Sequence, residues 1–90
     1  DVFELIFNQM DPVQNYKVLV SDYSNRVDEV LQSLGQDFIE YIKQEKSQHV
    51  RFIPQIIITV AEHQAQRNFV VDPVITMLSC VYKIQTIIRE

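Results

Sequence analysis

Ninety residues, of which 47% are hydrophobic and 22% charged, are enough for one folded domain and are not typical of a disordered chain. One glycine and three prolines disfavour a β fold rich in hairpins, because tight hairpin turns need glycine. The formal net charge of -4 disfavours nucleic acid as a partner, and no apolar run is long enough to insert across a membrane. Composition therefore favours an all-α fold, which we expect to be a small antiparallel bundle of about four helices.

The single cysteine, Cys80, allows no intrachain disulfide, and this favours a reducing, cytoplasmic location. No signal-peptide pattern opens the chain, and its first residue is Asp1 instead of Met. We therefore expect residues 1–90 to form a single helical domain that is excised from a larger protein.

The first third of the chain predicts a short helical segment followed by a long helix. The opening apolar residues predict one or two helical turns at the edge of the bundle; they are Val2, Phe3, Leu5, Ile6, Phe7 and Met10. Asp11 and Pro12 are a typical helix start, and apolar residues then recur every three or four positions as far as Leu34. Gly35 follows, where a helix ends most readily. The polar stretch 21–25 can kink or split this helix, because Ser, Asp and Asn compete for backbone hydrogen bonds.

A third, shorter helix is predicted from Gln36 to about Gln48, and Pro54 is predicted to open a fourth after a connector. The run Ile56–Val60 leaves a strand open as an alternative, because β-branched residues favour strands. We favour a helix, since no second convincing strand is present to pair with this run. An apolar linker, Val70 and Val71 included, then leads into the last helix. The predicted apolar side of the fourth helix is Ile57, Ile58, Ala61 and Ala65, and its polar side is Gln55, Thr59, Glu62 and Gln66.

The stretch 72–90 predicts the central helix of the bundle. Asp72 is a good N-cap, and Pro73 suits the first helical position. At 100° per residue the apolar arc of this helix is about 240° wide, against a stripe of roughly 100° on an ordinary surface helix. A helix this apolar must be surrounded by the rest of the chain or by a second copy. The residues expected to flank the arc and contact a partner are Ile75, Cys80, Tyr82 and Ile87.

Candidates for chemistry are few, and we expect no enzymatic activity, cofactor or metal. Cys80 lies in the most apolar helix, where a small core residue is a better interpretation than a nucleophile. A metal site would need a third or fourth ligand beyond His49 and His63. His63 is predicted at the border of a polar helix face. A solvated surface histidine is the favoured interpretation there, and a phosphoacceptor is the alternative.

These observations favour a non-catalytic protein–protein interaction or dimerisation module with a regulatory or scaffolding role. Its expected partner is a second copy or another domain of the parent protein, because the wide apolar arc needs cover. The alternative is a signalling bundle that transfers phosphate through His63. A third hypothesis is a fragment of a helical repeat array, whose apolar ends would be exposed in isolation.

Overall fold

The computed structural model describes residues 2–8, 11–69 and 72–89. Within these ranges all regular structure is helical, so the predicted all-α class is confirmed. The predicted residues Met10, Val70, Val71 and Glu90 lie outside the described part of the chain. The described α-helices are α1 (Val2–Phe7), α2 (Pro12–Tyr23), α3 (Val27–Gly35), α4 (Asp37–Glu45), α5 (Ile53–Gln66) and α6 (Pro73–Ile88), and the 3₁₀ helices are η1 (Ser47–Phe52) and η2 (Arg67–Phe69).

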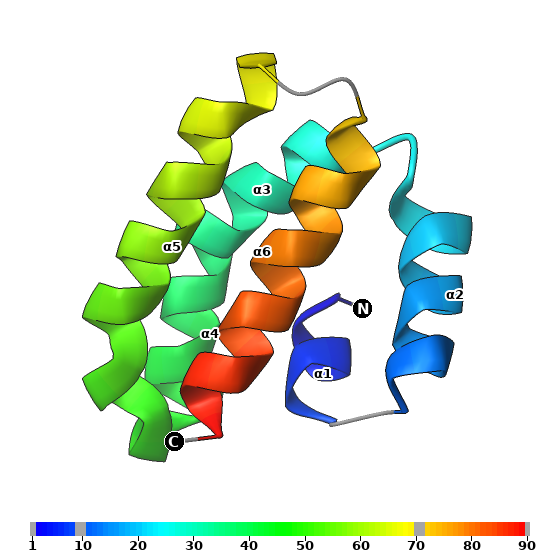
Figure 1. Cartoon of the computed structure of the whole chain (residues 1–90). Helices are drawn as coiled ribbons and strands as arrows, with labels where there is room; N and C mark the ends of the chain where they lie inside the picture. Colours follow the sequence, from blue (N-terminus) through cyan, green and yellow to red (C-terminus); the bar gives the residue numbers. More distant parts are fainter. Residues whose placement is uncertain (1, 9–10, 70–71, 90) are drawn as a thin grey trace.

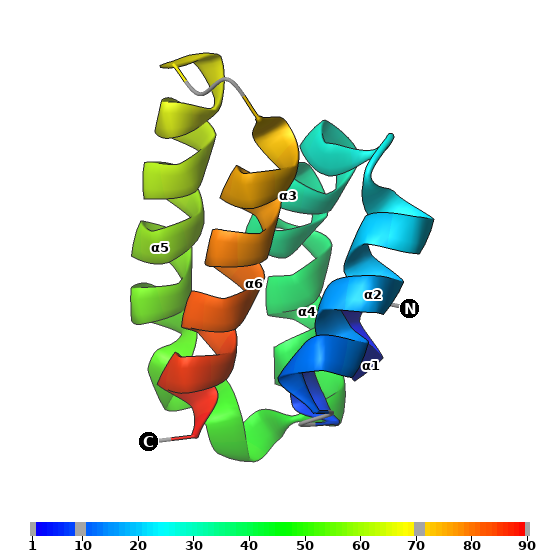
Figure 2. The ribbon, with the colours of Figure 1, turned by 45° about the vertical axis from the view of Figure 1, so that its right-hand side comes forward.

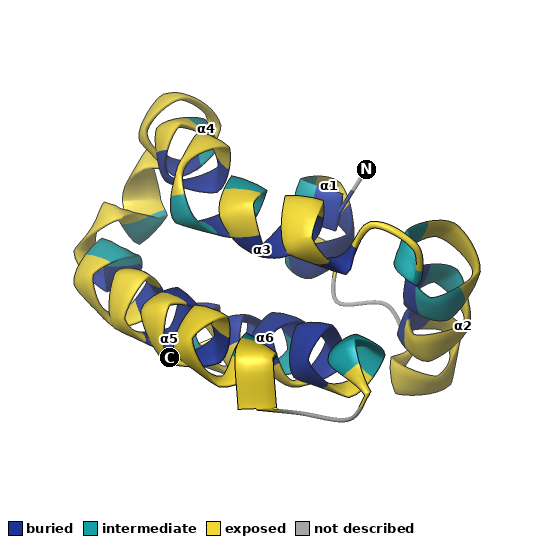
Figure 3. Cartoon of the chain, turned by 90° about the horizontal axis from the view of Figure 1, so that it is seen from above, coloured by how far each residue is buried: buried dark blue, intermediate teal, exposed yellow. Residues whose placement is uncertain are grey.

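The helices pack in two layers (Figure 3). One layer is α5 and α6, which run antiparallel; the other is α3 and α4 with α1 beside them, and α2 closes one edge (Figures 1 and 2). Helix α6 contacts α5, α3, α1 and α2, which confirms the prediction that it is central. The hydrophobic core lies between the layers. Its largest fully buried apolar side chains are Phe38, Ile6, Leu19, Leu34, Ile42, Ile56, Met77 and Ile84.

The long helix predicted to run as far as Leu34 is split in two, at the polar stretch named as its weak point. Helix α2 ends at Tyr23, and the Arg26 N–H donates to the Tyr23 carbonyl at 2.9 Å, so the chain turns there before α3 begins. Gly35 is the last residue of α3 instead of the residue after it. A Cβ built on Gly35 would lie 3.4 Å from the Val60 Cγ1 atom of α5, an ordinary van der Waals distance, so α3 and α5 are in contact at this point. This split and the short α1 account for six α-helices, where about four were expected.

The predicted strand alternative at Ile56–Val60 is wrong, because this run lies inside α5. The connector before it is also helical, since η1 covers the residues between α4 and α5. Pro54 sits in the first turn of α5, where the backbone N–H that proline lacks would have no partner within the helix.

Helix α6 begins as predicted. The Asp72 carboxylate accepts a hydrogen bond from the Val74 N–H at 3.0 Å, and Pro73 follows the cap. Two polar side chains of α6 are nevertheless buried: Thr76 is 4% exposed and Gln85 is 5% exposed. Gln85 Nε2 donates to the Leu5 carbonyl oxygen at 3.4 Å, which joins α6 to α1. The apolar arc of α6 is therefore covered largely by its own chain.

Replacing Asp72 with alanine is expected to lower the free energy of unfolding by about 0.5–2 kcal/mol, because the Val74 N–H loses its acceptor. Urea denaturation followed by circular dichroism measures the change. Asp11→Ala is the matched control, since Asp11 precedes α2 in the same Asp-Pro context but makes no capping side-chain hydrogen bond. Equal losses for the two variants would contradict a specific cap at α6.

Candidate functional site

His63 lies inside the fold instead of on its surface. Its side chain is 6% exposed, its Nδ1 atom is 2.7 Å from the Thr59 carbonyl oxygen, and its Nε2 atom is 3.0 Å from the Ser79 hydroxyl of α6. A carbonyl oxygen can only accept, so Nδ1 carries a proton, and in the neutral ring Nε2 then accepts from the Ser79 hydroxyl. The prediction of a solvated His63 is therefore wrong. With both ring nitrogens engaged and the ring enclosed, the geometry gives no support to His63 as a phosphoacceptor.

The four residues predicted to contact a partner do not form one surface. Cys80 is 0% exposed, which confirms it as a core residue and removes it from any contact surface. Burial also raises the pKa of its thiol to about 12, so the reactive thiolate is disfavoured. Tyr82 and Ile87 are partly buried against the core, and Ile75 alone is well exposed, at 63%. Ile87→Glu is consequently expected to weaken folding itself.

Helix α5 has an uncovered apolar side. The predicted apolar side, Ile57, Ile58, Ala61 and Ala65, is exposed, and the side that faces the core carries Ile56, Val60, His63 and Thr59, which is 5% exposed. Of the predicted polar side, Thr59 alone turns inward, while Gln55, Glu62 and Gln66 are exposed. Ile57 and Ile58 are 47% and 59% exposed. The wrong side was predicted to face the core because α5 is apolar on two sides and the inward His63 finds partners within the fold. We define the outer α5 face as its exposed apolar residues, which are Pro54, Ile57, Ile58, Ala61 and Ala65.

The outer α5 face forms one continuous stripe, because its members are spaced by three, one, three and four residues. The exposed outward side of α5 is visible in Figure 3. A surface helix usually carries charges on this side, yet Glu62 is the one acidic or basic residue of α5 apart from the buried His63. Phe69, 88% exposed in η2, adds apolar surface just past the end of this helix. The stripe therefore resembles a helix-packing face more than a solvated one.

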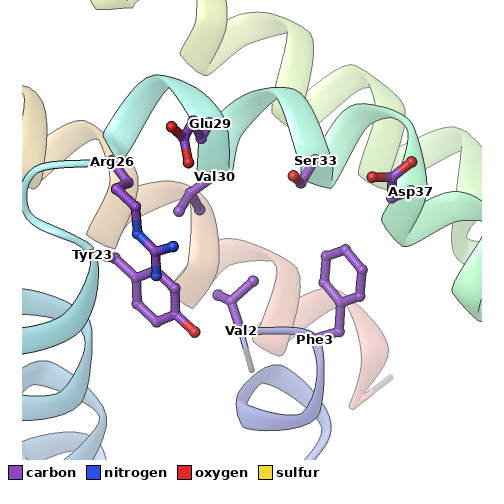
Figure 4. A pocket seen from close by; sticks show the side chains of 8 residues that line it. All are labelled: Val2, Phe3, Tyr23, Arg26, Glu29, Val30, Ser33 and Asp37. Carbon is purple, nitrogen blue, oxygen red and sulfur yellow. The ribbon is translucent and has the colours of Figure 1, made fainter.

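A second feature is a pocket of about 310 Å³ where α1, the end of α2 and α3 meet (Figure 4). We call it the α1–α3 pocket. Its floor is apolar, and three polar side chains form a row along one rim in Figure 4: Glu29, Ser33 and Asp37. The full lining is Val2, Phe3, Tyr23, Arg26, Glu29, Val30, Ser33 and Asp37.

Sequence reasoning assigned no role to the α1–α3 pocket. The available signal was the four-residue spacing of Glu29 and Ser33, which places them on one side of α3; Asp37 begins the next helix, after the break at Gln36. Nothing in the sequence showed that α1 would supply the floor from below, because Val2 and Phe3 are distant from α3 along the chain.

Among residues 2–8, 11–69 and 72–89, no group of three or more His, Cys, Asp or Glu side chains is placed to hold a metal ion. Within the same ranges, no helix has both the length and the apolar character needed to cross a bilayer. Comparison with protein-family models, curated proteins and solved structures finds no match for this chain. Function must therefore be inferred from the outer α5 face and the α1–α3 pocket.

Proposed function

We propose that the domain is a non-catalytic protein–protein interaction module that dimerises through the outer α5 face. The observation that carries the proposal is that α5 is apolar on two sides while the fold buries one of them. Water contact with isoleucine costs roughly 25 cal/mol per Å² of apolar area, so covering Ile57 and Ile58 favours association. A regulatory or scaffolding role in the cytoplasm is part of the same proposal, and the free thiol of the buried Cys80 fits the reducing environment of that compartment.

A second copy suits this face because the face is complementary to itself. In an antiparallel pair of α5 helices related by a two-fold axis, Ile58 of each copy can lie opposite Ala61 of the other, and Pro54 opposite Ala65. Ile58 and Pro54 then each meet an alanine, and small residues allow helix axes to approach closely. Closed two-fold dimers are also the commonest assembly of identical chains. A single helix face is smaller than the roughly 800 Å² per partner of a standard interface, so we expect a reversible dimer.

Ile58→Glu is expected to abolish dimerisation, because it places a charge at the centre of an apolar contact. Sedimentation velocity from micromolar to several hundred micromolar protein measures this. The wild type should shift from monomer to dimer, while the variant stays monomeric and keeps its fold, since the side chain is 59% exposed. Ile75→Glu is the matched control, with 63% exposure on α6, and it should dimerise like the wild type.

The register of the pair is tested by mixing two variants. Ala61→Lys alone should also be monomeric, but an equimolar mixture with Ile58→Glu should recover heterodimers, because the new charges then lie opposite each other. A wild type that stays monomeric at every concentration would contradict the proposal. Dimerisation that resists Ile58→Glu and fails with Ile75→Glu would move the interface to α6.

A further inference from the structure

We propose that the α1–α3 pocket binds an extended segment of a partner protein in which two basic residues flank an apolar one, spaced at i, i+2 and i+4. The apolar side chain enters the pocket, and the two cations meet Glu29 and Asp37 on its rim. This surface is formed by α1, α2, α3 and the start of α4, so it is separate from the outer α5 face and the inference does not depend on the proposed dimer.

The floor of the pocket suits an apolar side chain. Val2 and Val30 are 7% and 4% exposed, so they are held in place by the core beneath them, and Phe3 is partly buried at one end. The Phe3 ring is itself fixed by Phe38, with ring centroids 5.1 Å apart. A volume of about 310 Å³ accommodates one aliphatic side chain together with the stems of its neighbours. The cavity is thus preformed in the free protein.

The rim supplies the charge. Within the described residues Glu29 and Asp37 take part in no ion pair, whereas Glu40 pairs with Lys43 and Asp28 pairs with Arg67. Each lies in the first turn of its helix, where a carboxylate is favourable to the helix, and a bound cation leaves that contribution intact. A partner's ammonium or guanidinium group therefore gains a charge-assisted hydrogen bond without displacing an existing one.

The order of the rim residues suits an extended partner. Glu29 of α3 and Asp37 of α4 stand at the two ends of the rim row, with Ser33 between them (Figure 4). In an extended peptide, side chains at i and i+4 are about 13 Å apart on the same side of the backbone, and that at i+2 points the same way between them. Ser33, between the carboxylates, can hydrogen-bond the peptide backbone. A carboxylate at each end of the row is the reason for two cations instead of one.

Arg26 makes one end of the α1–α3 pocket more positive than the other. Its guanidinium lies 4.9 Å from the centroid of the Tyr23 ring and donates to the Asp22 carbonyl oxygen at 3.4 Å, so it is held at the Glu29 end. At the other end, a more open hollow of about 560 Å³ shares Asp37 and adds Glu40 and Glu45, with Lys46 as its basic residue. Negative potential is therefore greater toward α4, and a partner with further basic residues on that side would be favoured.

The test is a titration of isotope-labelled protein with the peptide Gly-Lys-Ala-Leu-Ala-Lys-Gly, followed by NMR amide shifts. We expect saturable shifts centred on Val30, Ser33 and Asp37, and binding at least tenfold weaker for the double variant Glu29→Gln/Asp37→Asn. Arg26→Gln should tighten binding by about threefold, since it removes a like charge near one lysine. The titration is repeated with the Ile58→Glu variant, so that peptide binding is measured independently of whether the protein dimerises.

Two controls make the test decisive. Glu62→Gln/Asp11→Asn removes the same amount of charge away from the pocket and should bind like the wild type. The peptide Gly-Ala-Ala-Leu-Ala-Ala-Gly keeps the central leucine without the lysines and should bind at least tenfold more weakly. Absence of saturable shifts, equal losses in the two double variants, or equal binding of the two peptides would each overturn the proposal.

Discussion

Phe38→Ala is expected to lower the free energy of unfolding by about 3–5 kcal/mol, a larger loss than replacing Asp72 or His63 with alanine should cause. Phe38 is 0% exposed, and its ring centroid lies 5.1 Å from that of Phe3, 5.9 Å from that of Phe7 and 6.3 Å from that of Tyr41. Removing this ring leaves a cavity and takes away the surface on which α1 packs. Six residues are too few for a helix to persist alone in water, so α1 should lose its structure first.

Urea denaturation measures the loss of stability, and amide hydrogen exchange in α1 measures its release. Phe69→Ala is the matched control, because it removes the same ring from a position that is 88% exposed, and it should change stability by less than about 0.5 kcal/mol. Phe38→Leu should cost less than Phe38→Ala, since it keeps part of the volume. The packing of α1 on α4 would be refuted by equal costs for Phe38→Ala and Phe69→Ala.

His63→Ala is expected to cost about 1–3 kcal/mol, which is the opposite of the near-neutral change expected for a solvated histidine. The ring joins the two helices of one layer, since Nδ1 donates within α5 and Nε2 accepts from Ser79 of α6. Its loss removes both hydrogen bonds and opens a cavity where the side chain was 6% exposed.

A double-mutant cycle with Ser79→Ala isolates the bond between the helices. Ser79→Ala alone should be the milder change, because its hydroxyl is at an exposed position and can turn to water. The double variant should lose less stability than the two single variants lose together, since both substitutions remove the same hydrogen bond. Strict additivity, or a His63→Ala variant as stable as the wild type, would contradict the geometry at His63.

Much of the fold follows from local signals in the sequence. The Asp72–Pro73 cap is confirmed because it depends on two adjacent residues and on the backbone they start. The break near Ser24 is likewise local, since residues that compete for backbone hydrogen bonds weaken a helix wherever they cluster. Asp11 shows the limit of this reasoning, because the same dipeptide starts α2 without a side-chain hydrogen bond.

The orientation of α5 could not be obtained in this way. Ile56 and Val60 lie on one side of the helix while Ile57 and Ile58 lie on the other, so hydrophobic periodicity does not decide which side faces the core. The buried side also carries His63, which counts as polar in a sequence pattern but is satisfied inside the fold by groups from two helices. For the same reason the sequence did not predict that the outer α5 face, on the side of the helix opposite His63, would be exposed.

The α1–α3 pocket was beyond sequence reasoning for a different reason. Part of its rim can be read from spacing, since Glu29 and Ser33 are four residues apart within α3, but Asp37 belongs to the next helix. Its floor includes Val2, and its end wall is the Arg26 guanidinium over the Tyr23 ring. The pocket forms only when three chain segments pack together, and a residue pattern within one segment does not predict that packing.

The central place of α6 has a consequence for synthesis on the ribosome. Helix α6 is the last described element to be translated, yet it contacts α5, α3, α1 and α2, and Gln85 reaches back to the Leu5 carbonyl 80 residues earlier. At 5–20 residues per second, the roughly 20 residues after α5 take about 1–4 s to be added. Throughout that interval the apolar residues of α1, α3 and α5 that pack against α6 are exposed to water. We expect the nascent chain to fold late and to be a substrate for chaperones that bind exposed apolar segments.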